Sequence, residues 1–286
     1  MINGFINFNK AAEMTSHDAV NFLRKIFRTK KIGHGGTLDP AATGILPIAA
    51  GRATKFLEYL ADFDKTYRAE ILFGTSTDSG DLDGKIISQI ENFFMPSTEI
   101  LKSTAKKFLG EIEQTPPKFS AIKINGQKAY DLARKNIDFE IPKRRMKIFR
   151  FEILDVEKNF VTAEIDCSKG TYIRTLAVDF GKSLNLPTTL KSLQRIRVGN
   201  FELKNSVTLE DLKNSPEKFL LPVENCLPFE KFFLPAHRVK AFLNGLPTNL
   251  NESDKIVRVF AEEKFLGVGK ICAGELRSEK IFMSGD

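Results

Sequence analysis

The chain of 286 residues contains no tryptophan and only three cysteines and three histidines. These six residues are scattered and include no C-x-x-C pair: Cys167, Cys226, Cys272, His17, His34 and His237. A disulfide framework is indicated by an even number of cysteines in a short chain, and a zinc site by closely spaced Cys or His ligands. The sequence therefore predicts neither, and it favours a reducing compartment.

Other patterns are absent too. No apolar run approaches the roughly 18 residues that a membrane helix needs. The first ten residues lack the basic and apolar segments of a secretory signal, so we expect a cytoplasmic protein. The sequence also has no phosphate-binding G-x-x-x-x-G-K-[ST] loop, no G-x-G-x-x-G after a strand, and no Ser-His-Asp signature.

One acidic stretch, residues 78–84, could be mistaken for a calcium-binding loop. Aligned with an EF-hand, it places Ser79 at the first ligand position and Ile90 at the twelfth. A loop without its first carboxylate and its bidentate glutamate binds calcium poorly. The stretch is interpreted as a polar turn, and the sequence predicts no metal and no cofactor.

The chain has an excess of positive charge. The formal net charge is +7 and the isoelectric point is about 9.2. Excess positive charge favours a polyanionic partner, because neutralising phosphates releases their counterions.

The segment Gly33–Lys55, GHGGTLDPAATGILPIAAGRATK, has the pattern of a functional site. Glycines around His34 allow the backbone to turn sharply. Pro40 disfavours a helical conformation at Asp39, so this carboxylate is expected on a stiff loop before a buried strand at 45–50. An Asx-type turn between two core elements would explain the same residues equally well.

Apolar periodicity predicts the remaining elements. Strands are expected within 1–10, 65–73, 149–156, 160–167, 256–260 and 265–271, the last one broken by Gly267 and Gly269. Helices are expected after Thr15 or Ser16, at 53–60, at 97–109, and to about 184. The buried face of the first helix is expected to hold Ala19, Phe22, Leu23, Ile26 and Phe27. Residues 111–147 are expected to be irregular apart from a short helix around 130–135, and the prolines in 215–235 indicate a boundary.

The segment Gly33–Lys55 resembles the signature of the TruB family of tRNA pseudouridine synthases, G-H-x-G-T-L-D-P-x-A-x-G-x-L followed by G-x-A-T-K. Every fixed position is present. A second family signature, S-K-G-T-Y-I-R-T, matches Ser168–Thr175 without a mismatch. The earlier K-P-x-G-x-[T/S]-S motif is only partly kept, since Ala11 replaces its proline and Glu13 its glycine.

The resemblance implies roles for individual residues. Asp39 would be catalytic, and Arg174 would pair with it and keep it ionised. Four residues would surround the target base: His34 fills the space that it leaves, Tyr67 stacks on it, and Tyr172 and Leu193 line its pocket. Taken alone, Tyr67 would be interpreted as a core aromatic.

A basic run near residue 145 could contact RNA phosphates, although a solvated face or a nuclear-signal-like run has the same composition. The expected backbone contacts are Lys10, Lys55, Lys143, Arg144, Arg145 and Lys147.

The resemblance also implies the architecture. We expect an α/β (α+β) pseudouridine synthase fold, with a mixed, largely antiparallel sheet and flanking helices. Residues 1–229 would form the catalytic domain, with a thumb-like insertion at about 111–147. Residues 230–286 would form a small, β-rich, PUA-like RNA-binding domain.

The implied activity is isomerisation of uridine to pseudouridine at position 55, in the T-loop of tRNA, by base flipping. The implied partner is the T-arm stem-loop, with no obligate protein partner and a monomeric enzyme. Two alternatives remain: an RNA-guided synthase of the same family, and a tRNA-binding or folding protein whose main role is not catalytic. Asp39, Tyr67 and Arg174 together favour an enzyme.

Overall fold

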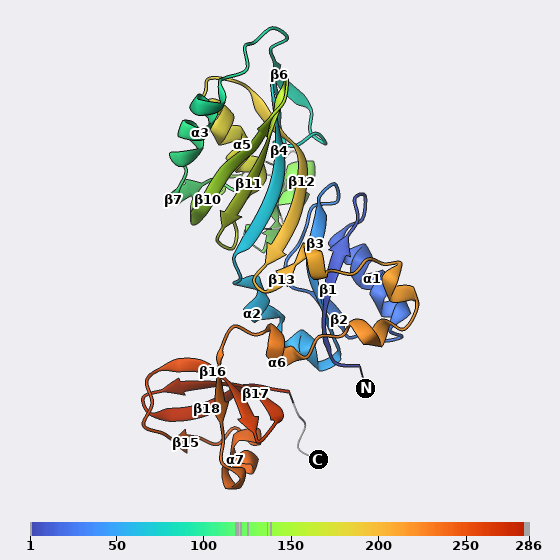
Figure 1. Ribbon diagram of the computed structural model, residues 1–286, viewed down its shortest axis with the longest axis vertical. Coiled ribbons are helices and arrows are strands. Elements are labelled where there is room, and N and C mark those ends of the chain that lie inside the picture. The colour runs from blue at the N-terminus through green and yellow to red at the C-terminus, as the bar shows by residue number, and fades with distance from the viewer. Residues whose placement is uncertain are drawn as a thin grey trace.

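A large twisted sheet forms the upper part of the molecule and a small sheet forms the lower part (Figure 1). The computed structural model describes residues 2–117, 120, 122–124, 126–135, 137 and 139–282. Within this part of the chain, no helix is both long and apolar enough to cross a membrane.

The large sheet has the strand order β1-β3-β12-β4-β11-β10-β7. The bounds are β1 Gly4–Lys10, β3 Thr43–Ala50, β12 Thr188–Val198, β4 Lys65–Phe73, β11 Phe160–Cys167, β10 Arg144–Val156 and β7 Gly110–Gln114. Two short strands extend it: β2 (Ile32–His34) pairs with β3, and β13 (Phe201–Glu202) pairs with β12. Only the β3–β12 pairing is parallel, so the expected mixed, largely antiparallel sheet is confirmed.

Three helices accompany this sheet: α1 (Ser16–Ile26), α3 (Thr98–Lys106) and α5 (Ile173–Lys182). Smaller elements join them, namely a 3₁₀ turn at Gly51–Phe56, α2 (Leu57–Ala61), the hairpin β5 (Thr75–Thr77) and β6 (Ile86–Gln89), the hairpin β8 (Lys123–Ile124) and β9 (Gln127–Lys128), α4 (Ala129–Arg134), and α6 (Val223–Cys226). Further 3₁₀ turns occupy Leu203–Asn205, Asp211–Lys213, Pro216–Phe219 and Ala236–Arg238.

Strand β4 shows why the sheet has one buried face. Its alternate residues Tyr67, Ala69, Ile71 and Phe73 belong to the main core, as expected from their period of two. On the other face, Arg68 is exposed.

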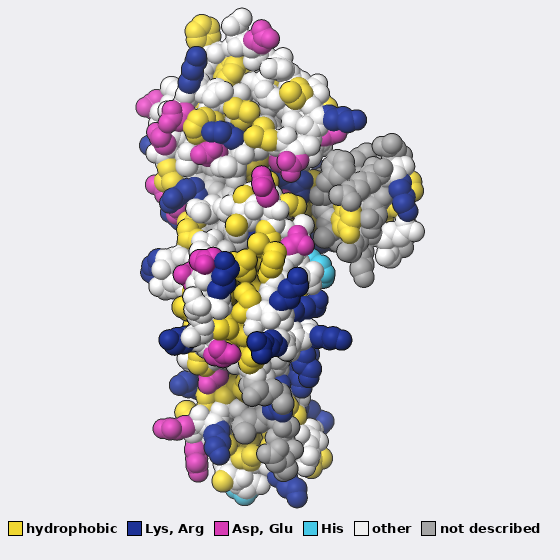
Figure 2. Space-filling view, turned by 90° about the vertical axis from the view of Figure 1, so that its right-hand side faces the viewer, with side chains coloured by type: hydrophobic (Ala, Val, Ile, Leu, Met, Phe, Trp, Pro, Cys, Tyr) yellow, Lys and Arg dark blue, Asp and Glu magenta, His cyan; other side chains and the backbone are white. Residues whose placement is uncertain are grey.

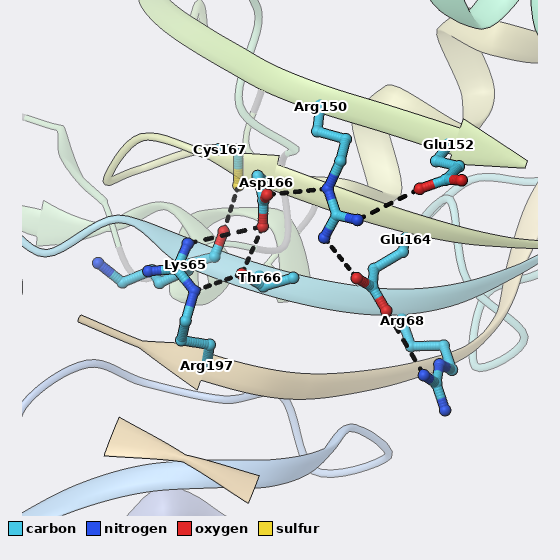
Figure 3. Close-up of polar contacts among 9 residues, drawn as sticks. All are labelled: Lys65, Thr66, Arg68, Arg150, Glu152, Glu164, Asp166, Cys167 and Arg197. Atoms are coloured by element: carbon cyan, nitrogen blue, oxygen red, sulfur yellow. Dashed lines mark hydrogen bonds and ion pairs between the residues drawn. The ribbon is translucent and has the colours of Figure 1, made fainter. Parts of the chain in front are cut away.

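That open face carries charges that neutralise one another (Figure 3). Arg150 on β10 contacts Glu152, Glu164 and Asp166. Arg197 on β12 also pairs with Asp166, at 3.6 Å. A groove of about 530 Å³ runs over this network, and its charged groups already have partners.

Two expectations about the large sheet were wrong. Phe22 is 42% exposed, because α1 buries only a narrow stripe that includes Val20 and Leu23. Residues 111–147 are not irregular throughout, because residues 110–114 form β7 and pair with residues 144–148 of β10. Sequence periodicity does not reveal a pairing between segments so far apart.

The small sheet has the order β14-β16-β17-β18-β15, with α7 (Val239–Leu243) beside it. The bounds are β14 Glu230–Phe233, β16 Lys255–Ala261, β17 Lys264–Cys272, β18 Glu275–Ile281 and β15 Thr248–Asn249. The glycines do not break β17, contrary to expectation. A side chain at Gly269 would lie 2.6 Å from Leu276, so glycine there permits close packing. The division at 229/230 stays a prediction.

Candidate active site

Asp39 and Arg174, 135 residues apart in the sequence, meet in the structure. The Nε atom of Arg174 lies 3.2 Å from Oδ2 of Asp39. Asp39 lies in the loop between β2 and β3, and Arg174 lies in the first turn of α5. The arginine is only 7% exposed, whereas the side chain of Asp39 is 46% exposed. The ion pair thus combines a solvent-accessible carboxylate with a buried guanidinium.

The start of α5 is held by a glutamine from the edge strand. Gln114 accepts a hydrogen bond from the amide of Tyr172 (3.0 Å) and donates one to its carbonyl (3.2 Å). Tyr172 is the N-cap residue of α5, and its own side chain makes no cap bond. Gln114 therefore positions the helix turn that carries Arg174.

A second arginine holds the loop before Asp39. Arg195 on β12 is fully buried and donates to the carbonyls of Gly36 (3.0 Å), Thr37 (3.2 Å) and Ile45 (2.7 Å). A side chain at Gly44 would lie 2.2 Å from the carbonyl oxygen of Arg195, so only glycine lets β3 and β12 approach here.

Other side chains hold the next residues of the loop. Ser16 donates to the carbonyl of Leu38 (3.1 Å) and accepts from its amide (2.9 Å). The carbonyl of Asp39 accepts from the amide of Ala42 at 3.1 Å. Each residue from Gly36 to Pro40 therefore has at least one hydrogen bond or ion pair that fixes its position.

Lys10 supplies the last of these anchors, which corrects its expected role in binding RNA. The side chain is fully buried, and its Nζ atom donates to the carbonyls of Ala11 (2.8 Å), Met14 (2.7 Å) and Pro40 (3.1 Å). Burial lowers the pKa of Lys10 to about 8, although the charge of Asp39 opposes the shift. An ammonium group enclosed in this way joins two loops and is not available to a phosphate.

The partly lost motif after Lys10 keeps its backbone shape. Glu13 stands where the family pattern has glycine, and it adopts a left-handed conformation with φ of 61°. Non-glycine residues take this conformation at a cost of about 1–2 kcal/mol. The early loop therefore retains a glycine-like turn in spite of the substitution.

Sequence reasoning missed a second carboxylate on Arg174. Asp81 lies 3.3 Å from Nη1 of Arg174, and the carbonyl of Ser79 accepts from the same guanidinium at 3.4 Å. Both residues belong to the acidic stretch 78–84, which is a turn as expected. The acidic composition of this stretch was the feature of the sequence that could have indicated a contact with Arg174. Among the described residues, no group of three or more His, Cys, Asp or Glu side chains is arranged to hold a metal ion.

The pKa of Asp39 is raised above its ordinary value, mainly because the surrounding protein atoms partly desolvate the carboxylate. The charge of Asp81 acts in the same direction, and those of Arg174 and Lys10 act against it. Arg174 therefore lowers the pKa of Asp39, as expected, but burial raises that pKa by more than the arginine lowers it.

The residues expected around the base occupy different environments. Tyr67 is only 7% exposed on β4, and burial raises the pKa of its hydroxyl. Leu193 on β12 is partly buried and packs on the main core. Tyr172 is partly buried at the start of α5.

His34 at the end of β2 is also partly buried. Its Nδ1 atom is buried without a hydrogen-bond partner in the described part of the chain. Burial, together with the charges of Arg195 and His17, lowers the pKa of the imidazole below its ordinary value, which favours the neutral form of His34.

The remaining basic residues are exposed. Lys55 follows β3 in the 3₁₀ turn, and Lys143 precedes β10. Arg144, Arg145 and Lys147 lie on β10 itself and not in an irregular lobe. The structure thus leaves them accessible to a phosphate, and Arg144 lies close enough to Tyr172 for its charge to lower the pKa of that hydroxyl.

The site can present an accessible carboxylate to a substrate, with Arg174 to stabilise its charge. The rings of Tyr67 and Tyr172 lie close enough for the charge of Asp39 to act on them. A carboxylate fixed in this way can act as a nucleophile or a base. Anchoring at each residue of its loop keeps this group in position without the cost of ordering it during the reaction.

Comparisons with known proteins cover almost the whole chain. The model of a family described as TruB family pseudouridylate synthase (N terminal domain) matches residues 24–173. A tRNA pseudouridine synthase B of Clostridium kluyveri is 37% identical over 99% of this chain and 100% of its own length. One of Francisella tularensis subsp. novicida is 39% identical over 98% of this chain and 95% of its own.

Solved structures show the same fold at lower identity. A chain of a Cbf5-Nop10-Gar1 complex superposes with a TM-score of 0.78 at 24% identity, covering 98% of this chain and 85% of its own. A chain of an H/ACA RNP bound to a substrate RNA containing 2'-deoxyuridine superposes with a TM-score of 0.77 at 23% identity. The match covers 99% of this chain and 86% of the other one. The expected α/β fold with a small β-rich C-terminal part is confirmed.

Proposed function

This chain belongs to the TruB family of pseudouridylate synthases, and we propose that it isomerises uridine to pseudouridine at position 55, in the T-loop of tRNA. The family membership makes it an isomerase. The relatives named as tRNA pseudouridine synthase B, which are 37–39% identical over 94–99% of this chain, support tRNA as the substrate.

The observation that carries the proposal is the ion pair of Asp39 and Arg174 at the end of an anchored loop. The reaction breaks the bond between N1 of uracil and C1′ of ribose and forms a bond between C5 and C1′. N1 gains a proton and C5 loses one, so no external group or redox partner is consumed. Asp39 assists this exchange at the sugar, which requires its ionised form.

The target uridine must leave its stack to reach a carboxylate in the cleft, at a cost of a few kcal/mol. Stacking on an aromatic side chain recovers about 1–3 kcal/mol, and Tyr67 is the ring proposed for this contact. Tyr172 and Leu193 complete the pocket. The neutral imidazole of His34 replaces the base in the RNA loop without adding a charge.

We also propose that the chain acts as a monomer without an obligate protein partner. The solved structures of Cbf5 contain other proteins, but at 23–24% identity they support the fold alone. Activity of the purified chain on tRNA, with sedimentation measured at the same concentration, tests this directly. Activity that appeared only after addition of another protein would overturn it.

Asp39→Asn tests the reaction. The amide has nearly the same shape as the carboxylate but is neither a nucleophile nor a base, so turnover should vanish while tRNA binding remains. Tritium release from tRNA labelled at C5 of uridine, with mapping of the modified position, measures both rate and site. Asp62→Asn, at an exposed carboxylate paired with Lys169, is the control and should retain activity.

Two results would contradict the proposal. Residual turnover of Asp39→Asn within about tenfold of the unmodified protein, or ~1.4 kcal/mol in barrier height, would remove Asp39 from its role. Pseudouridine formed by the unmodified protein only outside the T-loop would remove the proposed substrate position.

A further inference from the structure

A small basic pocket lies at the other end of β3 from Asp39. Its volume is about 250 Å³, and its basic lining residues are Arg28, Lys31 and Arg52. The remaining lining is Ile2, Phe27, Thr29 and Gly51, so no described residue that lines it is acidic. The pocket thus concentrates three positive charges without a lining carboxylate.

The backbone of this pocket is well fixed. The amide of Lys31 donates to Oγ1 of Thr29 at 3.2 Å, and the amide of Gly51 donates to the carbonyl of Lys31 at 2.8 Å. The amide of Arg52 donates to Oδ1 of Asn3 at 2.7 Å, and its guanidinium donates to the carbonyl of Phe282 at 3.2 Å. The pocket therefore lies where the large sheet meets the end of the small one.

Two of its cations have no counter-charge among the residues with a described placement. Neither Arg28 nor Lys31 makes an ion pair with any residue that the structure describes, and both are exposed. On the open face of the large sheet, by contrast, Arg150 pairs with Glu164 and Asp166. An anion from outside the chain is the group that would balance these two.

Arg28 also occupies a position that favours glycine. It follows α1 with φ of 49°, and the amides of Arg28 and Thr29 bond back to the carbonyls of Lys25 (3.3 Å) and Arg24 (3.1 Å). This is the Schellman ending of a helix, in which glycine is the usual left-handed residue. Arg28 therefore places a cationic side chain at a helix end where glycine is the usual residue.

The pocket is too far from Asp39 to belong to the catalytic cleft. Strand β3 has eight residues and runs from beside Asp39 to Gly51. At a rise of about 3.3 Å per residue, the two sites are roughly 25 Å apart. Figure 2 shows Lys and Arg side chains gathered over the waist of the molecule, between the large and small sheets.

We propose that the pocket of Arg28, Lys31 and Arg52 binds a backbone phosphate of the substrate RNA, at a point on its stem remote from the target uridine. The proposal rests on the proposed function, since it assumes that an RNA occupies the cleft. B-DNA rises about 3.4 Å per base pair, and an A-form RNA duplex rises less, so the contact lies more than about seven base pairs from the flipped base.

A simpler role for these cations would be to stabilise the C-terminal end of α1. The helix dipole places about half a negative charge there, and basic residues near it contribute typically 0.3–1 kcal/mol. That role predicts that removing the charge of Arg28 destabilises the protein. If phosphate binding is the main role of Arg28, its charge adds little to the stability of the free protein, and glycine should stabilise the free protein by relieving the left-handed backbone.

The test compares hairpins that share one uridine-containing loop and differ in stem length, about four against about twelve base pairs. Binding is measured over a range of salt concentrations for Arg28→Gly and Lys31→Ala. Each variant should bind the long hairpin about fivefold more weakly, with a salt slope smaller by about one. The short hairpin should be bound unchanged.

Lys25→Ala is the matched control, because it removes the same charge from α1 outside the pocket. It should leave both affinities unchanged. Thermal unfolding gives the second readout, in which Arg28→Gly should raise the melting temperature. Turnover of the short hairpin should persist in every variant, and its absence in the unmodified protein would refute the proposed function instead.

Equal affinities for the long hairpin in the two pocket variants and the unmodified protein would overturn the proposal. An equal loss for short and long hairpins would also overturn it, since the contact would then lie near the loop. A lower melting temperature for Arg28→Gly with unchanged RNA binding would assign the arginine to the helix end.

Discussion

At the scale of single residues, Arg174 contacts two carboxylates, and the second affects the protonation of the first. Asp81 lies 3.3 Å from Nη1 of the guanidinium, whereas Asp39 contacts its Nε atom. Its negative charge raises the pKa of Asp39, in addition to the larger effect of burial. A raised pKa means that Asp39 loses its charge at a less acidic pH than an exposed carboxylate does.

We predict that Asp81→Asn moves the acidic limb of the rate profile to lower pH. The rate falls as pH decreases through the pKa of Asp39, and removing a neighbouring negative charge lowers that pKa. Single-turnover rates measured across the acidic range give the midpoint. Because Asp81 also holds Arg174, the plateau rate should fall as well.

Asp78→Asn is the control on the same turn. Asp78 accepts a hydrogen bond from the amide of Lys85, which the amide oxygen of asparagine also accepts, and it is not among the groups that shift Asp39. Its midpoint should be unchanged. A midpoint for Asp81→Asn at or above that of the unmodified protein would contradict the electrostatic account.

At the scale of elements, the loop from Gly36 to Pro40 is rigid because three distant segments bind it. Arg195 comes from β12, Ser16 from the start of α1, and Lys10 from the end of β1. None of these contacts touches Asp39 itself. Their effect on the reaction is through the position of the carboxylate, to which rates are sensitive at a displacement of about 1 Å.

We predict that Ser16→Ala slows the reaction about tenfold to a hundredfold while it leaves tRNA affinity nearly unchanged. The change removes both hydrogen bonds to Leu38, the residue before Asp39. Thermal unfolding, binding and single-turnover rates are measured on one preparation. A stability loss of about 1–3 kcal/mol is expected from the unpaired buried groups.

Thr15→Ala separates loop position from general stability. Thr15 is the N-cap of the same helix, and its loss costs about 1 kcal/mol without a contact to the loop. The rate of this variant should remain close to that of the unmodified protein. Equal slowing in both variants would show that helix stability, and not the position of Leu38, controls the rate.

At the scale of the whole molecule, the two sheets share a core. Phe56, in the turn after β3, is fully buried and stacks against Phe265 at 6.0 Å and Phe282 at 6.0 Å between ring centroids. Lys280 on β18 also pairs with Glu58 at 2.9 Å. The apolar contact is the stronger link, since an exposed ion pair contributes at most about 1 kcal/mol.

We predict that Phe56→Ala destabilises the protein by about 3–5 kcal/mol and separates its thermal unfolding into two transitions. The cavity would lie between the sheets, so the small sheet should melt independently. Calorimetry compares this variant with Phe73→Ala, whose buried ring packs on Phe180 within the large sheet. That control should lower stability without a second transition, and a single transition in both variants would contradict the prediction.

Much of the fold and site could be predicted from sequence because the signals are local. The alternation of residues 65–73 depends on the pleat of one strand, and β4 has these bounds. The cap of α1 depends on Thr15 and Asp18, and both halves of the capping box form. The pairing of Asp39 with Arg174 was accessible only through a family resemblance, since 134 residues separate them.

The sequence by itself determined which groups can react: one carboxylate on a proline-stiffened loop, an arginine at a helix start, and a surplus of positive charge. Only the tertiary structure decided where the other charges act. It buried Lys10 among carbonyls, placed Asp81 on Arg174, and assembled Arg28, Lys31 and Arg52 around one pocket. These outcomes depend on contacts between distant segments, and a side chain's burial and partners are not encoded in its immediate neighbours.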